Sequence, residues 1–124
     1  MPCSYYRFDG GVRPWIVFGQ ICSQDLFMYL MHRVEHKASA KFYQVSHKPH
    51  HVFTNPRLFD AFDGSVPDTA TMILFPLAVT ARIFDANVWE YMIFGAGWSA
   101  WLALIHSEIS HPWDTAFRAI GLGA

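Results

Sequence analysis

The segment 32–51 reads HRVEHKASAKFYQVSHKPHH and contains five of the seven histidines of this 124-residue chain. The histidines form two clusters, an H-x3-H at residues 32–36 and an H-x2-H-H at residues 47–51. On a helix, side chains four residues apart lie on one face, one turn apart. His32 and His36 are therefore expected to bind one metal ion from the same face of a helix.

Pro49 determines how the second cluster is arranged. Proline disfavours the helical conformation in the residue before it and has no backbone N–H of its own. We therefore place His47 near the end of a helix, and His50 and His51 just beyond the proline or at the start of a new helix. His47 and His50 then point the same way, and His51 reaches a second ion.

The residue types narrow the kind of metal site. Neutral imidazole is a good ligand for Fe, Zn, Cu and Ni, and the shortage of thiolates argues against an iron–sulfur cluster. The two cysteines, Cys3 and Cys22, have no zinc-finger spacing and are too few for a disulfide framework. A single histidine is most often an ordinary surface or core residue, but five histidines at these two spacings predict a metal centre.

The composition is that of a membrane protein. Hydrophobic residues make up 52% of the chain and charged residues only 15%, whereas about a quarter of the residues in soluble domains are charged. The net charge is −1, and nucleic-acid binding needs a basic patch. No nucleic-acid partner is therefore expected.

Three apolar segments predict membrane helices, at residues 15–31, 69–84 and 88–105. An amphipathic helix at residues 37–46 is expected to continue from the first of them and to lie in the membrane interface. Turn signals at residues 52–67 predict a loop. The expected fold class is all-α, an integral membrane bundle of about three membrane helices with interfacial helices on the cytosolic side.

Local features refine these helices. Asp68 or Thr69 is expected to cap the second apolar helix, and Pro76 is expected to kink it. Asp25 would be costly in lipid, so we expect its side chain to face protein or metal. Small residues at positions 95–100 are expected to allow close helix packing.

Helix direction gives an independent check on the histidines. Three membrane helices alternate in direction, which places His106 and His111 on the same side as segment 32–51. Six basic residues lie with the histidines and three lie opposite, namely Arg33, Lys37, Lys41, Lys48, Arg57 and Arg118 against Arg7, Arg13 and Arg82. By the positive-inside rule, we expect the histidines on the cytosolic face.

The pattern Asp25-x3-Tyr29-x2-His32-Arg33-x2-His36, followed by His47-Lys48-Pro49-His50-His51, resembles the fatty acid hydroxylase/sterol desaturase superfamily. The resemblance extends over nearly the whole chain. It implies an integral membrane enzyme, in eukaryotes mostly of the endoplasmic reticulum, that holds two iron ions with histidines. Such enzymes use O2 to hydroxylate or desaturate a fatty acyl chain or a sterol. The Lys48-Pro49 pair is similar to sterol C5-desaturases, and the implied electron donor is cytochrome b5 or a similar protein.

The resemblance also implies which residues form the site. The metal ligands would be His32, His36, His47, His50, His51 and His106, with His111 as a further candidate. Asp25 and Glu108 are candidates for hydrogen bonds to these ligands. Glu35 is next to the ligands but is expected to point off their face into solvent.

The chain departs from the family pattern near its end. A third cluster, another H-x2-H-H, normally follows, and this sequence reaches Ala124 without one. We therefore expect one domain, residues 1–124, that is C-terminally incomplete. The alternative is a non-catalytic membrane protein, a shortened or degenerate relative with a partial histidine metal site.

Two other classes fit the residues less well. A haem-binding helix bundle with His32 and His106 as axial ligands has no use for the adjacent His50 and His51. A soluble zinc hydrolase with an H-E-x-x-H motif would need its glutamate at the position of Arg33.

Overall fold

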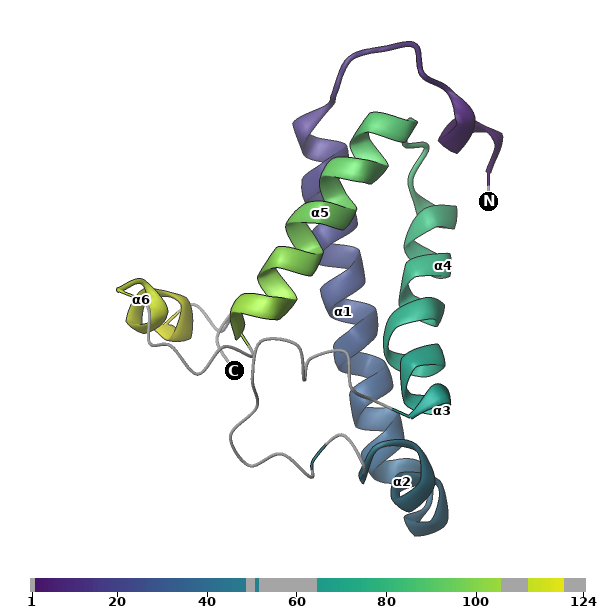
Figure 1. Ribbon diagram of the computed structural model, residues 1–124, viewed down its shortest axis with the longest axis vertical. Helices are drawn as coiled ribbons and strands as arrows, with labels where there is room; N and C mark the ends of the chain where they lie inside the picture. Colours follow the sequence, from purple (N-terminus) through teal and green to yellow (C-terminus); the bar gives the residue numbers. More distant parts are fainter. Residues whose placement is uncertain (1, 49–50, 52–64, 106–111, 120–124) are drawn as a thin grey trace.

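The computed structural model describes residues 2–48, 51, 65–105 and 112–119, and all of its elements are helical (Figure 1). The prediction of an all-α fold is confirmed for these residues. The elements are a 3-10 turn (Cys3–Tyr6), α1 (Pro14–Ala38), α2 (Ala40–Ser46), α3 (Val66–Thr69), a π-helical turn (Ala70–Leu74), α4 (Phe75–Ile83), α5 (Val88–Ile105) and α6 (Asp114–Ala119).

Helix α1 is the longest element, with 25 residues. Pro14 occupies its first turn, where the missing N–H costs no hydrogen bond. The helix continues well beyond the apolar segment that predicted it and ends at Ala38. Both histidines of the first cluster, His32 and His36, therefore lie on its last turns.

Ser39 separates α1 from α2, whereas the sequence predicted one continuing helix. Its backbone is extended (φ −165°, ψ 152°), and its side chain accepts a hydrogen bond of 3.0 Å from the N–H of Phe42. A serine that caps in this way satisfies one of the free N–H groups at a helix start. The chain therefore changes direction at Ser39, and α2 lies across the lower end of α1 (Figure 1).

Residues Val66–Ile83 form one helical rod with an irregular middle. Ser65 caps the rod by accepting from the N–H of Asp68, so the prediction that Asp68 or Thr69 is the cap is wrong. In the π turn, the N–H of Phe75 bonds to the carbonyl of Ala70, five residues back. Pro76 explains this widening, because its ring would crowd the carbonyl four residues before it in a regular α-helix.

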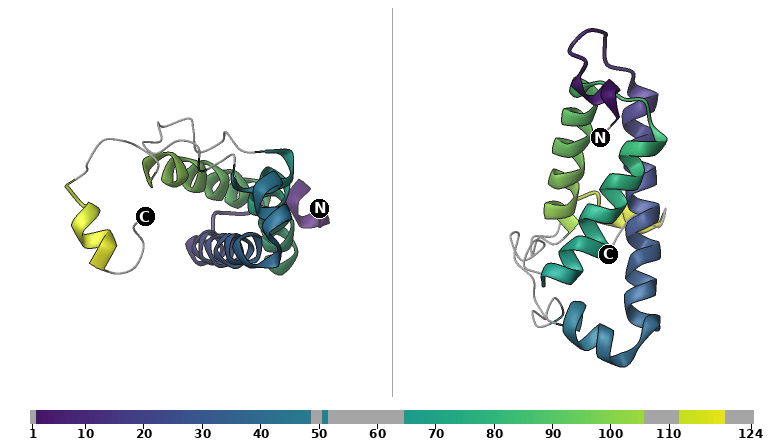
Figure 2. Two further views of the ribbon diagram at one scale, coloured as in Figure 1. Left: turned by 90° about the horizontal axis from the view of Figure 1, so that it is seen from below. Right: turned by 90° about the vertical axis from the view of Figure 1, so that its right-hand side faces the viewer.

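The long helices pack as a small bundle in which α1 contacts both α4 and α5 (Figures 1 and 2). Helices α1 and α5 run in the same direction, and α4 runs opposite to them. Phe94, Trp98 and Leu102 follow one another at four-residue intervals on α5 and form one of two buried clusters, the other being Tyr5, Ala81 and Ala86. Side chains of α1 and of the rod, including Ile21 and Leu77, pack against the α5 cluster.

Helix packing is closest at a glycine that the sequence did not single out. A Cβ at Gly19 of α1 would lie 2.6 Å from the ring of Phe84, so only glycine leaves room for that ring. At Gly95 and Gly97 of α5, a Cβ would meet nothing within 4 Å. The prediction that small residues of α5 mark close packing is therefore wrong for Gly95 and Gly97.

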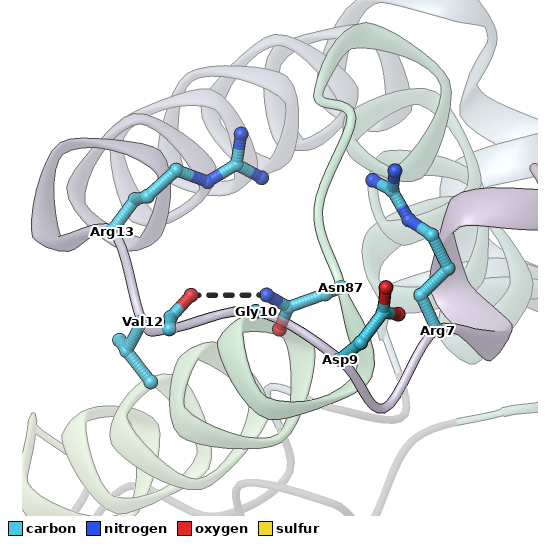
Figure 3. A pocket seen from close by; sticks show the side chains of 7 residues that line it. Arg7, Asp9, Gly10, Val12, Arg13 and Asn87 are labelled. Atoms are coloured by element: carbon cyan, nitrogen blue, oxygen red, sulfur yellow. Dashed lines mark hydrogen bonds between the residues drawn. The ribbon is translucent and has the colours of Figure 1, made fainter.

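A salt bridge ties the start of α1 to the start of α5. Nε and Nη2 of Arg13 donate to the two carboxylate oxygens of Glu90 at 2.7 and 2.8 Å, and the hydrogen bonds raise the pKa of Arg13. Asn87 and Glu90 form a capping box, each accepting from the other's backbone N–H. Figure 3 shows Asn87 also donating to the carbonyl of Gly11, 3.1 Å away, across a pocket of about 380 Å³.

One helical stretch in the described residues, Val66–Ile83, is long and apolar enough to cross a membrane. The sequence predicted about three such helices. The other two predicted segments do form helices, α1 and α5. In the described residues, neither of them is a further candidate span. Helix α1 carries a row of exposed apolar side chains at Trp15, Phe18, Leu26 and Tyr29.

Candidate metal centre

The first cluster is presented by the end of α1. The rings of His32 and His36 lie one helical turn apart, with their centroids 4.6 Å from each other. His32 is half-buried and His36 is exposed. Their spacing on one helix face is the arrangement that the H-x3-H motif predicted.

The end of α2 brings the second cluster to the same place. The ring of His47 lies 4.6 Å from that of His32 and 4.9 Å from that of His36, centroid to centroid. Nε2 of His51 lies 2.9 Å from Nε2 of His47. Four imidazoles from two helices therefore converge at one point.

The geometry of these four histidines fits a metal ion. Each of them offers one ring nitrogen, and the four nitrogens lie within 4.8 Å of one another. Metal–imidazole bonds of about 2.0–2.1 Å place the ligand atoms around one ion roughly 3–3.5 Å apart. Small rotations of the rings would bring His32, His36, His47 and His51 to those distances, and all-imidazole sites suit Fe and Zn.

The opposite side of the His47 ring meets two carboxyl groups. Nδ1 of His47 lies 2.7 Å from Oδ1 of Asp68 and 2.9 Å from Oε2 of Glu35. His47 is 1% exposed, Glu35 0% and Asp68 6%. In a neutral imidazole that donates Nδ1–H to a carboxylate, Nε2 carries no hydrogen and can act as a metal ligand. Nε2 of His47 faces Nε2 of His51 in this cluster.

Hydroxyl groups from the neighbouring helices hold these carboxyl groups. Oε1 of Glu35 accepts from Oγ of Ser46 at 2.5 Å and from Oγ1 of Thr71. Ser65 donates to the carbonyl of Ser46 at 2.6 Å and accepts from the N–H of Asp68. The ends of α1 and α2 and the start of the rod are therefore fixed to one another around His47.

A family model described as fatty acid hydroxylase matches residues 17–121. The chain belongs to the fatty acid hydroxylase family. The resemblance that the histidine clusters suggested is thereby confirmed.

Two curated relatives of this family member are similar to it over most of its length. The chain is 55% identical to an alternative squalene epoxidase of Phaeodactylum tricornutum, over 99% of its own length and 36% of the relative. It is 29% identical to a Delta(7)-sterol 5(6)-desaturase of Aspergillus fumigatus, over 84% of its own length and 39% of the relative. The chain thus spans just over a third of each relative, and no solved structure matches it.

The structure of this fatty acid hydroxylase family member brings four predicted ligands together, His32, His36, His47 and His51. The other predicted site residues, His50, His106, His111 and Glu108, lie outside the described residues. Asp25 has an exposed side chain on α1, so its expected contact with protein or metal is not what the structure shows.

Sequence reasoning misplaced Glu35 and missed the site role of Asp68. Glu35 was expected in solvent, which is wrong, since its side chain is fully buried beside His47. It lies about 60° around α1 from His32, near enough to face α2 and the rod. Asp68 could have been found from topology, because the second apolar helix starts on the side where the first one ends.

Proposed function

We propose that this chain is the metal-binding part of an O2-dependent lipid oxidoreductase with histidine-held iron. The observation that carries the proposal is the convergence of four imidazoles at the junction of α1 and α2, with ligand atoms within 4.8 Å. Membership of the fatty acid hydroxylase family and the similarity to an alternative squalene epoxidase support it.

The proposed centre holds two iron ions. His32, His36, His47 and His51 would hold one ion, and His50, His106 and His111 would contribute to the second. When bound, the iron supplies the activation of O2 and the oxidation of the lipid. The balance requires two electrons and two protons for each epoxidation or hydroxylation, in which one oxygen atom enters the lipid and the other leaves as water. Desaturation uses the same electrons and protons, removes two hydrogens from the lipid and releases both oxygen atoms as water.

The residues of the chain position and shield the centre. Glu35 and Asp68 fix the orientation of the His47 ring, and burial among α1, α2 and the rod keeps water away from that side of it. His36 and His51 are exposed in the described part of the chain, so O2 and a lipid tail would approach from their side.

The substrate class that we propose is a squalene-like or sterol lipid. A relative that is 55% identical is named for squalene and another, at 29% identity, is named for a sterol. Neither of these two relatives is named for a fatty acyl chain, the other substrate that the family implies. The chain spans just over a third of each of these relatives. The proposed activity is therefore that of a whole protein in which this stretch would carry the histidines.

The protein is proposed to reside in the membrane of the endoplasmic reticulum, with the histidines on the cytosolic face. The exposed apolar row on α1 and the apolar rod Val66–Ile83 support membrane insertion. Arg33, Lys37 and Lys41 lie on the surface at the histidine end, as the positive-inside rule requires of the cytosolic side. A donor such as cytochrome b5 would then deliver electrons from the cytosol.

A chimera tests this proposal directly. Residues 1–124 replace the matching segment of the alternative squalene epoxidase from Phaeodactylum tricornutum, and the chimera is expressed in yeast membranes that lack squalene epoxidase. We expect conversion of squalene to its epoxide and iron bound to the purified chimera. A chimera that inserts and binds iron but oxidises neither squalene nor a sterol would overturn the substrate proposal.

The same experiment separates the enzyme from the non-catalytic alternative. If the chimera binds fewer than two irons and forms no O2-dependent product, the partial-site alternative is correct. The expected C-terminal incompleteness remains a prediction. The coding sequence beyond Ala124 tests it, and a further H-x2-H-H there is the expected result.

A further inference from the structure

Two carboxyl groups are buried beside the histidine cluster, and in the described residues neither contacts a lysine or an arginine. Glu35 is fully buried and Asp68 nearly so, and both approach Nδ1 of His47. The Glu35 side chain also accepts from the hydroxyls of Ser46 and Thr71. No lysine or arginine contacts either carboxyl group among the described residues, so the two groups share the ring of His47 and these hydroxyl donors.

One oxygen of this pair is left without a hydrogen-bond donor. Nδ1 of His47 offers one hydrogen and lies closer to Asp68 than to Glu35. Oε2 of Glu35 is accordingly buried with no hydrogen-bond partner in the described part of the chain. An uncompensated buried charge costs several kcal/mol, so such a pair survives in a fold only where something offsets it.

A divalent ion at the histidine cluster would supply that compensation. Four neutral imidazoles contribute no charge to the ion that they hold, and two carboxylates behind one of them contribute two negative charges. In a medium of low dielectric constant, the attraction between the ion and the two carboxylates on the far side of the His47 ring is strong. Carboxylates that accept from the far nitrogen of a ligand histidine also make that histidine a stronger ligand.

We propose that Glu35 and Asp68 are positioning and charge-balancing residues for the metal ion, acting through His47. The inference rests on the proposed function only in requiring that the four histidines hold a metal. Glu35 and Asp68 thereby have a role that the histidine motifs do not contain, and their charges are expected to favour a divalent cation at the four histidines.

Isosteric amide variants test the pair, with Co(II) as the probe. Glu35→Gln keeps the acceptor for Ser46 and Thr71, and Asp68→Asn keeps an acceptor for His47, while each removes one charge. We expect each variant to bind Co(II) 10- to 100-fold more weakly, as for other groups that support ligand histidines. The metal-free melting temperature is expected to stay the same or rise, because an uncompensated charge has been removed.

Asp9→Asn is the matched control, since Asp9 is an exposed carboxylate in the pocket at the opposite end of the bundle. Its Co(II) affinity should equal that of the wild type. Asp68→Glu should recover part of the affinity that Asp68→Asn loses.

The outcomes separate this inference from the proposed function. Unchanged Co(II) affinity in both amide variants would overturn the inference while the metal site stands. Weaker binding that is accompanied by a lower metal-free melting temperature would show a purely structural role and would also overturn it. A wild-type chain that binds no Co(II) would instead remove the proposed metal centre itself.

Discussion

Each end of the bundle buries a glutamate completely, but the two glutamates have different surroundings. Glu90, at the start of α5, is held by the guanidinium of Arg13 and by backbone N–H groups of Arg13 and Asn87. Glu35, at the end of α1, is held by two hydroxyl groups and faces an imidazole. Both side chains are 0% exposed.

The difference separates a structural end from a functional end. At the Glu90 end, the buried carboxylate has a cationic partner within the protein, and the hydrogen bonds of Arg13 hold two helix starts together. At the Glu35 end, the described contacts include two carboxyl groups and no lysine or arginine, and ring nitrogens of four histidines converge next to them. Such an imbalance is typical of a site that is completed by a cation.

The largest effect is expected from His47, which joins the carboxyl pair to the cluster. His47→Ala removes the ligand that contacts both His32 and His51 and leaves Glu35 and Asp68 without their shared partner. We expect metal loading to be lost, as measured by metal analysis of the purified chain. Asn87→Ala, at the other end, should leave metal loading at the wild-type value. Full loading of the His47 variant would exclude His47 as a ligand.

Cysteine labelling is expected to show whether the two ends lie on opposite sides of a membrane. Cys3 and Cys22 are both exposed, and Cys22 lies midway along α1 in the apolar row. In sealed microsomes, an impermeant maleimide should label Cys3 only after the vesicles are opened. Cys22 should react at least about tenfold more slowly than Cys3 until detergent is added, because thiolate chemistry needs water. Rapid labelling of Cys22 in intact membranes would argue against lipid around α1.

Melting temperatures should distinguish the two glutamates by a smaller amount. Glu90→Ala leaves Arg13 and the N–H of Asn87 without their acceptor, so we expect a loss of at least about 1 kcal/mol. In a domain of this size that lowers the melting temperature by about 4 °C. The decrease should be equal with and without Co(II). Glu35→Gln, which keeps the acceptor for Ser46 and Thr71, should lower it only with Co(II) present. An equal decrease under both conditions would make the two ends alike.

The smallest effect is expected from two glycines in the helices. Gly19→Ala should destabilise the chain by about 1 kcal/mol, because the ring of Phe84 must move. Gly97→Ala meets nothing within 4 Å and should stabilise α5 by up to about 1 kcal/mol through helix propensity. Thermal unfolding of both variants measures the difference, and a Gly19 variant as stable as the Gly97 variant would contradict the packing of Phe84.

The sequence predicted the helices well because their signals are local. Apolar runs located α1, the rod and α5, and Pro14 marked the start of α1. The break at Ser39 was missed because serine is tolerated inside helices, and its capping role depends on the direction that α2 takes. The π turn was missed for a similar reason, since Pro76 predicts a distortion without saying which form it takes.

The site was predictable in its histidines and not in its carboxyl groups. The spacing of a motif on one helix face predicts which histidines can meet, and His32, His36, His47 and His51 do meet. Asp25 was chosen because a carboxylate is costly in lipid, and Glu35 was set aside because it was expected to point off the ligand face. Which face of α1 receives α2 and the rod is a tertiary property, and it is this packing that buries Glu35 and brings Asp68 to His47.

The extended backbone at Ser39 separates the two histidine clusters into two helices, so the length of α2 determines where His47 lies. Helix α2 is rigid and only seven residues long, so its length sets both the reach and the phase with which His47 arrives at the end of α1. One inserted residue would rotate His47 by about 100° and advance it by about 1.5 Å, which would aim its ring away from the cluster. The metal centre therefore depends on the interval of eleven positions between His36 and His47 as well as on the identity of the histidines.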